Sequence, residues 1–183
     1  MRIRMFISIP IADEQAVAPV LADMRLTDNV RPSSSSQMHI TVRFIGDIDD
    51  GRTGKVAKAV SDAVAGMEPF MITIGNAGCF PKPERPSVLW IGAEPGDRLR
   101  SLSDSIARNL RASNIKFDER PFKGHITVGR CTGPVDPRPF IEKYSGKELC
   151  SFLCDEILIM RSDLGPKGAK HTVLDRIRIG VPN

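Results

Sequence analysis

Cysteine is scarce in this sequence. The 183 residues include four cysteines, and no two of them are spaced as a C-x-x-C pair. That pair is the usual signature of a thiolate zinc site or a dithiol redox centre, so both interpretations are weak here. Because no signal peptide is recognisable, we expect free thiols, mostly buried, rather than disulfides. The four residues are Cys79, Cys131, Cys150 and Cys154.

Long hydrophobic runs are missing as well. No stretch approaches the roughly 20 apolar residues that a membrane-spanning helix needs. The N-terminus opens directly into a strand-like segment, without the apolar core and small-residue cleavage site of a signal peptide. We therefore expect a cytoplasmic protein that makes no membrane contact. The length suits one compact domain over residues 1–183, divided into two lobes, and we expect a monomer.

Positive charge is in modest excess, but no long run of lysine or arginine occurs. The net charge is +4 and the isoelectric point is near 9.0. Such a balance suits a polyanionic partner, although many proteins of similar charge never bind nucleic acid. The charge favours RNA only in combination with the motifs described next.

Only three histidines are present, and two of them begin the same tetrapeptide. The sequence His-Ile-Thr-Val starts at His39 and again, 86 residues later, at His125. Its β-branched residues favour a strand, in which side chains alternate between two faces. We predict that each histidine projects together with the threonine two residues on, Thr41 or Thr127. The alternate residues are predicted to point into a core: Ile40, Val42 and Phe44 in the first copy, Ile126 and Val128 in the second.

Two imidazoles and two hydroxyls suit chemistry at a phosphate. A neutral imidazole can take a proton from water, and an imidazolium can give one to a leaving oxygen. Each threonine can donate a hydrogen bond to a non-bridging phosphate oxygen. A lone histidine on a strand is more often structural, but the repetition favours a catalytic pair. Zinc is a poorer interpretation, because two histidines are too few and no carboxylate or thiolate lies at ligand spacing beside them. We predict no metal site.

Two arginines and the third histidine are further candidates. Arg43 shares the predicted face of the first motif. Strict alternation would place Arg130 on the face opposite the second histidine, unless Gly129 relaxes the strand there. Both arginines are therefore candidate substrate ligands. His171 lacks a threonine two residues on, and we predict that it is non-catalytic and lies at the rim of the cleft.

Apolar periodicity predicts strands and helices in a similar succession in both halves of the chain. Pro19 predicts a kink in the first helix or a delayed start, and residues 30–37 are typical of a loop. The strands are expected at 2–9, 38–45, 70–74, 88–92, 124–130, 149–160 (one or two) and 171–179, and the helices at 12–24, 55–65, 97–113 and 137–144.

The repeated motif within this succession indicates an internal duplication. The predicted fold class is α+β. Two similar lobes, each a mostly antiparallel sheet with helices on its outer face, are expected to be related by a pseudo-twofold axis, with both motif histidines in the central cleft. The connection at 75–86 carries Phe80, Lys82 and Arg85, which can stack on a base and hold a phosphate, but we favour a plain hairpin tip with solvated charges.

Taken together, these features resemble the two-histidine (2H) phosphoesterases, and more closely the RNA 2′,3′-cyclic phosphodiesterases, also called 2′-5′ RNA ligases. The resemblance spans nearly the whole chain. It is carried by the two His-x-Thr-x motifs, by Arg130, and by the segments Arg2-Ile3-Arg4-Met5-Phe6-Ile7, Phe44-Ile45-Gly46-Asp47, Val88-Leu89-Trp90-Ile91-Gly92 and Arg161-Ser162-Asp163-Leu164.

The resemblance implies an enzyme that opens an RNA terminal 2′,3′-cyclic phosphate to a 2′-phosphate without a metal or cofactor. It implies that His39 is the proton donor, that His125 is the proton acceptor, and that Thr41 and Thr127 hold the phosphate. The near-identical motifs do not themselves say which histidine is acid and which is base. Two alternatives stay open: 2′-5′ RNA ligation by the same site, and a binding module for RNA or a nucleotide that performs no turnover.

Overall fold

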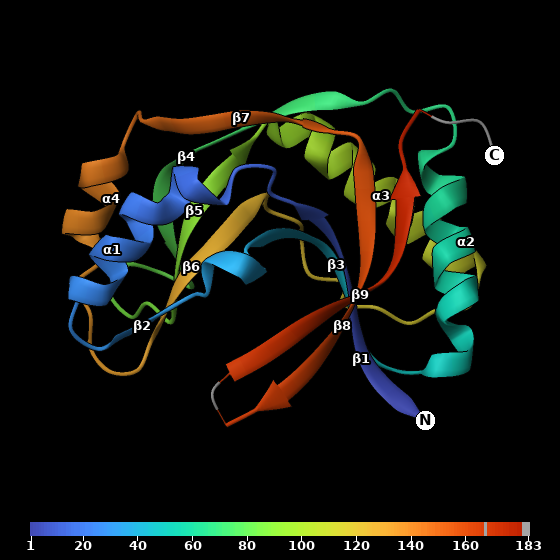
Figure 1. The fold of residues 1–183 in the computed structure, drawn as a ribbon, viewed down its shortest axis with the longest axis horizontal. Helices are drawn as coiled ribbons and strands as arrows, with labels where there is room; N and C mark the ends of the chain where they lie inside the picture. Colours follow the sequence, from blue (N-terminus) through green and yellow to red (C-terminus); the bar gives the residue numbers. More distant parts are fainter. Residues whose placement is uncertain (167, 181–183) are drawn as a thin grey trace.

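The computed structural model describes residues 1–166 and 168–180 and contains two antiparallel sheets (Figure 1). The four-stranded sheet has the order β3-β1-β8-β9, and the five-stranded sheet has the order β2-β6-β5-β4-β7. The strands are β1 (Arg2–Pro10), β2 (Val30–Pro32), β3 (His39–Asp49), β4 (Phe70–Phe80), β5 (Val88–Glu94), β6 (His125–Cys131), β7 (Glu148–Cys154), β8 (Glu156–Gly165) and β9 (Gly168–Arg178).

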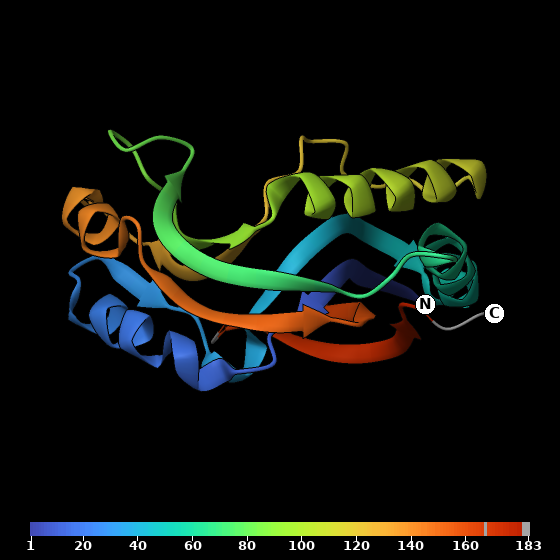
Figure 2. The ribbon, with the colours of Figure 1, turned by 90° about the horizontal axis from the view of Figure 1, so that it is seen from above.

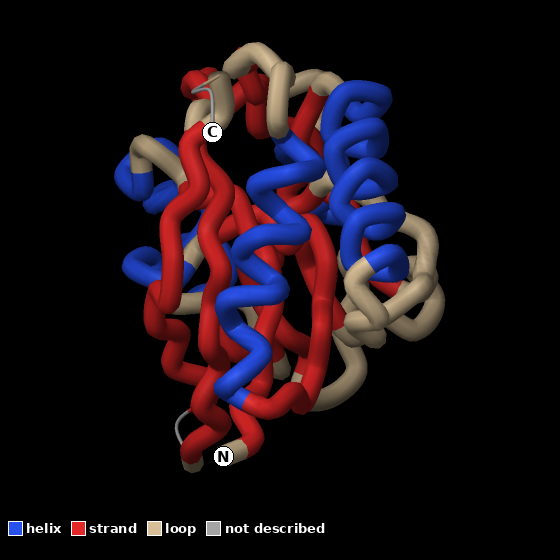
Figure 3. Tube along the Cα trace, turned by 90° about the vertical axis from the view of Figure 1, so that its right-hand side faces the viewer, coloured by secondary structure: helices blue, strands red, loops and turns tan. Residues whose placement is uncertain are grey.

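Four helices cover these sheets: α1 (Ala18–Leu26), α2 (Thr53–Val64), α3 (Gly96–Ala112) and α4 (Arg138–Tyr144). Helices α1 and α4 pack on the five-stranded sheet at one end of the molecule, and α2 packs on β8 and β9 at the other end (Figure 1). Helix α3 contacts α2, β3 and β5, so it spans both sheets (Figure 2). Figure 3 shows α2 in front of the strands, running roughly along their length.

The two sheets repeat one strand order, which confirms the predicted α+β architecture. The order β3-β1-β8-β9 in one sheet corresponds, strand by strand, to β6-β5-β4-β7 in the other, as a pseudo-twofold axis requires. Strand β2 has no counterpart and is added beside β6. The two lobes interleave along the chain. Helix α1 follows β1 in sequence, yet it packs beside β2 and β6 of the other sheet.

Local chemistry explains where the helices begin and which face they bury. The Asp13 side chain accepts hydrogen bonds from the backbone of Gln15 and Ala16 and caps a short 3₁₀ turn. Pro19 lies in the first turn of α1, where its missing N–H costs nothing, so the delayed start is confirmed. In α3 the residues at helical spacing are fully buried: Leu99, Leu102, Ile106 and Leu110.

Three expectations about the fold were wrong. The strand predicted at 70–74 continues as β4 to Phe80, so residues 75–80 are not part of a connection. Residues 30–32 form β2 rather than loop, because this three-residue segment gains its hydrogen-bond partners from β6, which lies about 100 residues away in sequence. The four cysteines are free, as expected, but only Cys154 is buried, and the other three are half-buried near strand ends.

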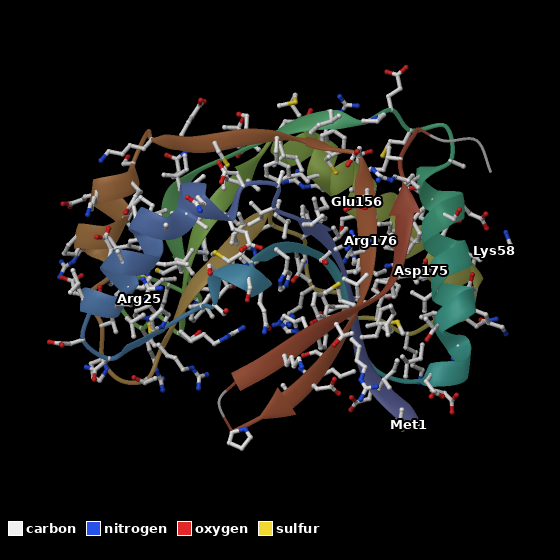
Figure 4. The ribbon with its side chains drawn as sticks, viewed as in Figure 1. Met1, Arg25, Lys58, Glu156, Asp175 and Arg176 are labelled. Atoms are coloured by element: carbon white, nitrogen blue, oxygen red, sulfur yellow. The ribbon has the colours of Figure 1, made fainter. Side chains whose placement is uncertain are left out.

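The last two strands form a long hairpin that projects from the body of the molecule (Figure 1). An ion pair across it joins Arg176 Nη1 to Glu156 Oε1 at 2.9 Å, and both residues are labelled in Figure 4. Across the described part of the chain, no helix combines the length and the hydropathy that a membrane span requires.

Candidate active site

His39 and His125 have matching settings at the starts of β3 and β6. The Nδ1 of His39 donates to the Gln37 carbonyl at 2.8 Å, and the Nδ1 of His125 donates to the Lys123 carbonyl at 2.7 Å. A carbonyl oxygen can only accept, so each Nδ1 carries the proton and each neutral ring presents an unprotonated Nε2. At His39 this Nε2 lies 3.1 Å from Thr41 Oγ1.

Both histidines and both threonines line one cavity of about 410 Å³ between the two sheets, here called the first groove. It is bordered by β1, β2, β3, β6 and the β8–β9 hairpin. A second groove of about 600 Å³ is bordered by Phe80 and the 118–123 segment. Thr41, His125, Thr127 and Arg130 border both grooves, so the site lies where the two meet.

A β-bulge at the last residue of each motif reverses the side-chain alternation beyond it. In β3, Thr41 pairs with Ser8 and Arg43 pairs with Ile7, which leaves Val42 as the extra residue. In β6, Val128 is extra in the same way. A bulge shifts every later side chain to the other face. Arg130 therefore lies on the same side as His125 and borders the cavity, contrary to strict alternation.

The bulge in β3 places Arg43 and Phe44 on the faces opposite to those predicted. Arg43 is buried and does not border the first groove. Its guanidinium donates to Ser103 O, Arg120 O and Asp104 Oδ1, each at 3.3 Å. Phe44 lines the first groove instead of pointing into the main core. Arg43 thus ties β3 to α3 and to the segment before β6, although it still borders the second groove.

Aromatic rings pack against both imidazoles, a feature that the sequence reasoning missed. The His39 ring lies 4.8 Å from the Phe6 ring, and the His125 ring lies 4.9 Å from the Phe80 ring, centroid to centroid. Phe80 in turn packs on Trp90 at 5.3 Å, so this residue is part of the site. Lys82 and Arg85 are exposed and border neither groove, which confirms the expected tip with solvated charges. In the sequence, the signal for this contact was Phe80 at a strand end, close to Lys82 and Arg85.

His171 lies closer to the site than predicted. Its ring packs edge-on against His39 at 5.3 Å, and its backbone N–H donates to Gln37 Oε1 at 3.2 Å. Gln37 thereby contacts both His171 and His39, because its backbone carbonyl also accepts a hydrogen bond from His39. The Nδ1 of His171 is buried and has no hydrogen-bond partner among the described residues.

Burial disfavours the charged form of all three imidazoles. It lowers the pKa of His39 to about 4, and the positive charge of Arg130 acts in the same direction. Burial also lowers the pKa of His125 and of His171. Both motif histidines are therefore neutral at pH 7 in the free protein. Within residues 1–166 and 168–180, no three histidine, cysteine or acidic side chains meet in a way that could hold a metal ion.

A match to a family model shows which protein family this chain belongs to. Residues 13–166 match the 2′-5′ RNA ligase superfamily. The chain belongs to this superfamily. Two relatives with the name RNA 2′,3′-cyclic phosphodiesterase agree with it. The protein of Methanothermobacter thermautotrophicus is 28% identical over 98% of this chain and 100% of its own length. That of Thermotoga maritima is 30% identical over 77% of this chain and 75% of its own length.

Solved structures share the superfamily fold. TT0787 of Thermus thermophilus superimposes with a TM-score of 0.80 at 21% identity, covering 96% of this chain and 97% of that one. LigT of Escherichia coli, in its apo form, gives a TM-score of 0.79 at 20% identity, covering 97% and 98%. The resemblance to the 2H phosphoesterases that the motifs predicted is confirmed.

Proposed function

We propose that this chain is an RNA 2′,3′-cyclic phosphodiesterase that opens the terminal ring to a 2′-phosphomonoester without a metal. The observation that carries the proposal is the matched pair of imidazoles: His39 and His125 each have Nδ1 tied to a backbone carbonyl and border the same cavity. The names of the superfamily relatives agree with this substrate. One base and one acid, held on rigid strands, are what in-line hydrolysis of a phosphodiester requires.

In the proposed reaction, His125 Nε2 takes a proton from water as the water oxygen attacks phosphorus. The bond from phosphorus to the 3′ oxygen breaks, and His39 gives its Nε2 proton to that oxygen. The phosphate stays on the 2′ oxygen. Thr41, Thr127 and Arg130 donate hydrogen bonds to the non-bridging oxygens as charge builds on them. His39 has to be charged first, and the bound phosphate anion raises its pKa, opposing the effects of burial and of Arg130.

The direct test is an RNA oligonucleotide ending in a 2′,3′-cyclic phosphate, incubated with the protein in EDTA. We expect ring opening with the phosphate left on the 2′ oxygen, because the acid on the 3′ side releases that oxygen. A 3′-phosphate product would reverse the roles of His39 and His125. Turnover that needs added metal, or no turnover at all, would contradict the proposal.

The pH dependence should reflect the buried histidines. Turnover needs one imidazole protonated and the other neutral, and that form of the free protein is most abundant midway between the two pKa values. Because both values lie below the usual 6.5, and that of His39 is about 4, we expect the optimum of kcat/KM below pH 6.5. The kcat optimum should lie at higher pH, because bound phosphate raises both values. A flat profile, or a kcat/KM optimum above pH 7, would contradict the assignment.

The second groove favours 2′-5′ RNA ligation as a second candidate. It reaches Thr41, His125 and Thr127 past Phe80 and the 118–123 segment, whereas the first groove reaches them past β2 and the β8–β9 hairpin. The second groove therefore leaves room for an RNA strand whose 5′-hydroxyl replaces water as the nucleophile. The same phosphorus–oxygen bond breaks in both reactions. Adding a 5′-hydroxyl RNA to the assay reports this activity as a 2′-5′ linked product.

A further inference from the structure

Two arginines lie directly opposite each other on the paired strands β2 and β6. Arg31 pairs directly with Arg130 in the antiparallel register of β2 and β6. Residues so placed have Cβ atoms about 4.5–5.5 Å apart, and like charges in this position are destabilising. Both side chains are exposed and border the first groove, and neither has an acidic partner among the described residues. An anion bound between them would remove the repulsion.

The whole first groove carries positive charge that no acidic side chain in the described part of the chain neutralises. Arg4 also borders it, with its guanidinium 4.6 Å above the Phe44 ring. Its cross-strand neighbour is Asp47, but Arg4 makes no ion pair with it or with another acidic side chain among residues 1–166 and 168–180. None of the described residues lining this groove is an aspartate or glutamate. The second groove differs, because the two arginines that border it alone are neutralised: Arg43 pairs with Asp104 and Arg120 with Asp118. Arg130, which borders both grooves, is the arginine that the two share.

The unpaired cations exceed what the reacting group needs. A cyclic phosphate diester carries one negative charge, which Arg130 balances while the two motif threonines donate to its oxygens. Arg31 and Arg4 are then left facing the same groove without an anion. Guanidinium groups bind phosphate through paired, charge-assisted hydrogen bonds. The chemistry on this side of the site therefore suits a second phosphate, one position along an RNA strand.

We infer that Arg31, together with Arg4, binds the internucleotide phosphate on the 5′ side of the cyclic end, so that the substrate is an RNA of at least two nucleotides. This inference rests on the proposed function and specifies the substrate of that site. A mononucleotide 2′,3′-cyclic phosphate has no such phosphate and leaves both arginines unpaired. The RNA strand runs through the first groove, between β2 and the β8–β9 hairpin.

The test compares a dinucleotide with a mononucleotide, each ending in the same base and a 2′,3′-cyclic phosphate. We expect the wild type to favour the dinucleotide in kcat/KM by about tenfold or more, the size of one charge-assisted interaction. Arg31→Gln should lower this preference by about tenfold, and Arg31→Lys should lower it less. Because the readout is a ratio of two substrates on one protein, a general loss of folded protein does not change it.

Arg25→Gln is the matched control. Arg25 is exposed on α1, outside both grooves, and its place in the fold is labelled in Figure 4. This variant removes the same charge and should keep the dinucleotide preference. The salt dependence of kcat/KM for the dinucleotide should also be shallower in Arg31→Gln, by a log–log slope of about 0.7, because this variant neutralises one phosphate fewer.

The outcomes separate this inference from the proposed function. If the wild type opens both substrates with equal kcat/KM, the second phosphate site is wrong and the proposed function stands. The inference is also overturned if Arg25→Gln loses the preference as Arg31→Gln does, because the effect is then non-specific attraction. If the wild type opens neither substrate, nor a longer RNA, the proposed function fails first.

Discussion

His125→Ala is expected to lower kcat for opening of an RNA 2′,3′-cyclic phosphate by about 10²–10⁴-fold, and His39→Ala by a similar factor. In the proposed mechanism each substitution removes one proton-transfer group, while the strand and its hydrogen-bond ladder stay in place. Removing both should cost little more than removing one, because acid and base act in the same step. Single-turnover measurements at saturating RNA check the loss in the chemical step directly.

His171→Phe is the control that tests whether the third histidine also takes part in proton transfer. A phenyl ring can keep the edge-on packing that His171 makes with His39 and Phe6, but it carries no titrating nitrogen. We expect its kcat to stay within about tenfold of the wild type, since the contact that it changes is second to the proton transfers. A loss as large as that of His125→Ala would mean that the pair of motif histidines is not the complete acid–base machinery.

Gly78→Ala is the second change with a large expected effect. A Cβ at Gly78 would lie 2.1 Å from Cζ2 of Trp90, its cross-strand partner, whose side chain is only 8% exposed. The ring has to move, and overpacking of this kind costs about 1–3 kcal/mol. Because Trp90 packs on Phe80 and His125, the displacement reaches the candidate base. We expect a melting temperature several degrees lower, together with reduced kcat.

The single tryptophan of the chain makes this result easy to read, because its emission reports the Trp90 site alone. Gly78→Ala should shift that emission toward the red as the ring becomes more exposed. Gly54→Ala in α2 is the matched control, since a Cβ there meets no atom within 4 Å. It should leave emission and activity unchanged and raise stability slightly. Identical emission and melting in the two variants would contradict the close packing of Gly78 on Trp90.

Much of this molecule follows from local pattern. The β-branched repeats predict the two motif strands, the 3.6-residue spacing in 97–113 predicts α3, and Pro19 predicts the late start of α1. The duplicated motif was enough to predict two equivalent sheets with a cleft between them. These predictions succeed because they depend on residues that are neighbours in sequence, whose side-chain periodicity already encodes which face is buried.

Only the tertiary structure decided which side chains meet at the cleft. The bulges at Val42 and Val128 depend on how neighbouring strands pair, and each reverses the alternation beyond it, sending Arg43 away from the first groove and Arg130 into it. His171 reaches His39 from more than 130 residues away, and β2 exists because β6 supplies its partners. Strand register and long-range contacts of this kind come from packing between distant segments, which a periodicity within one segment does not contain.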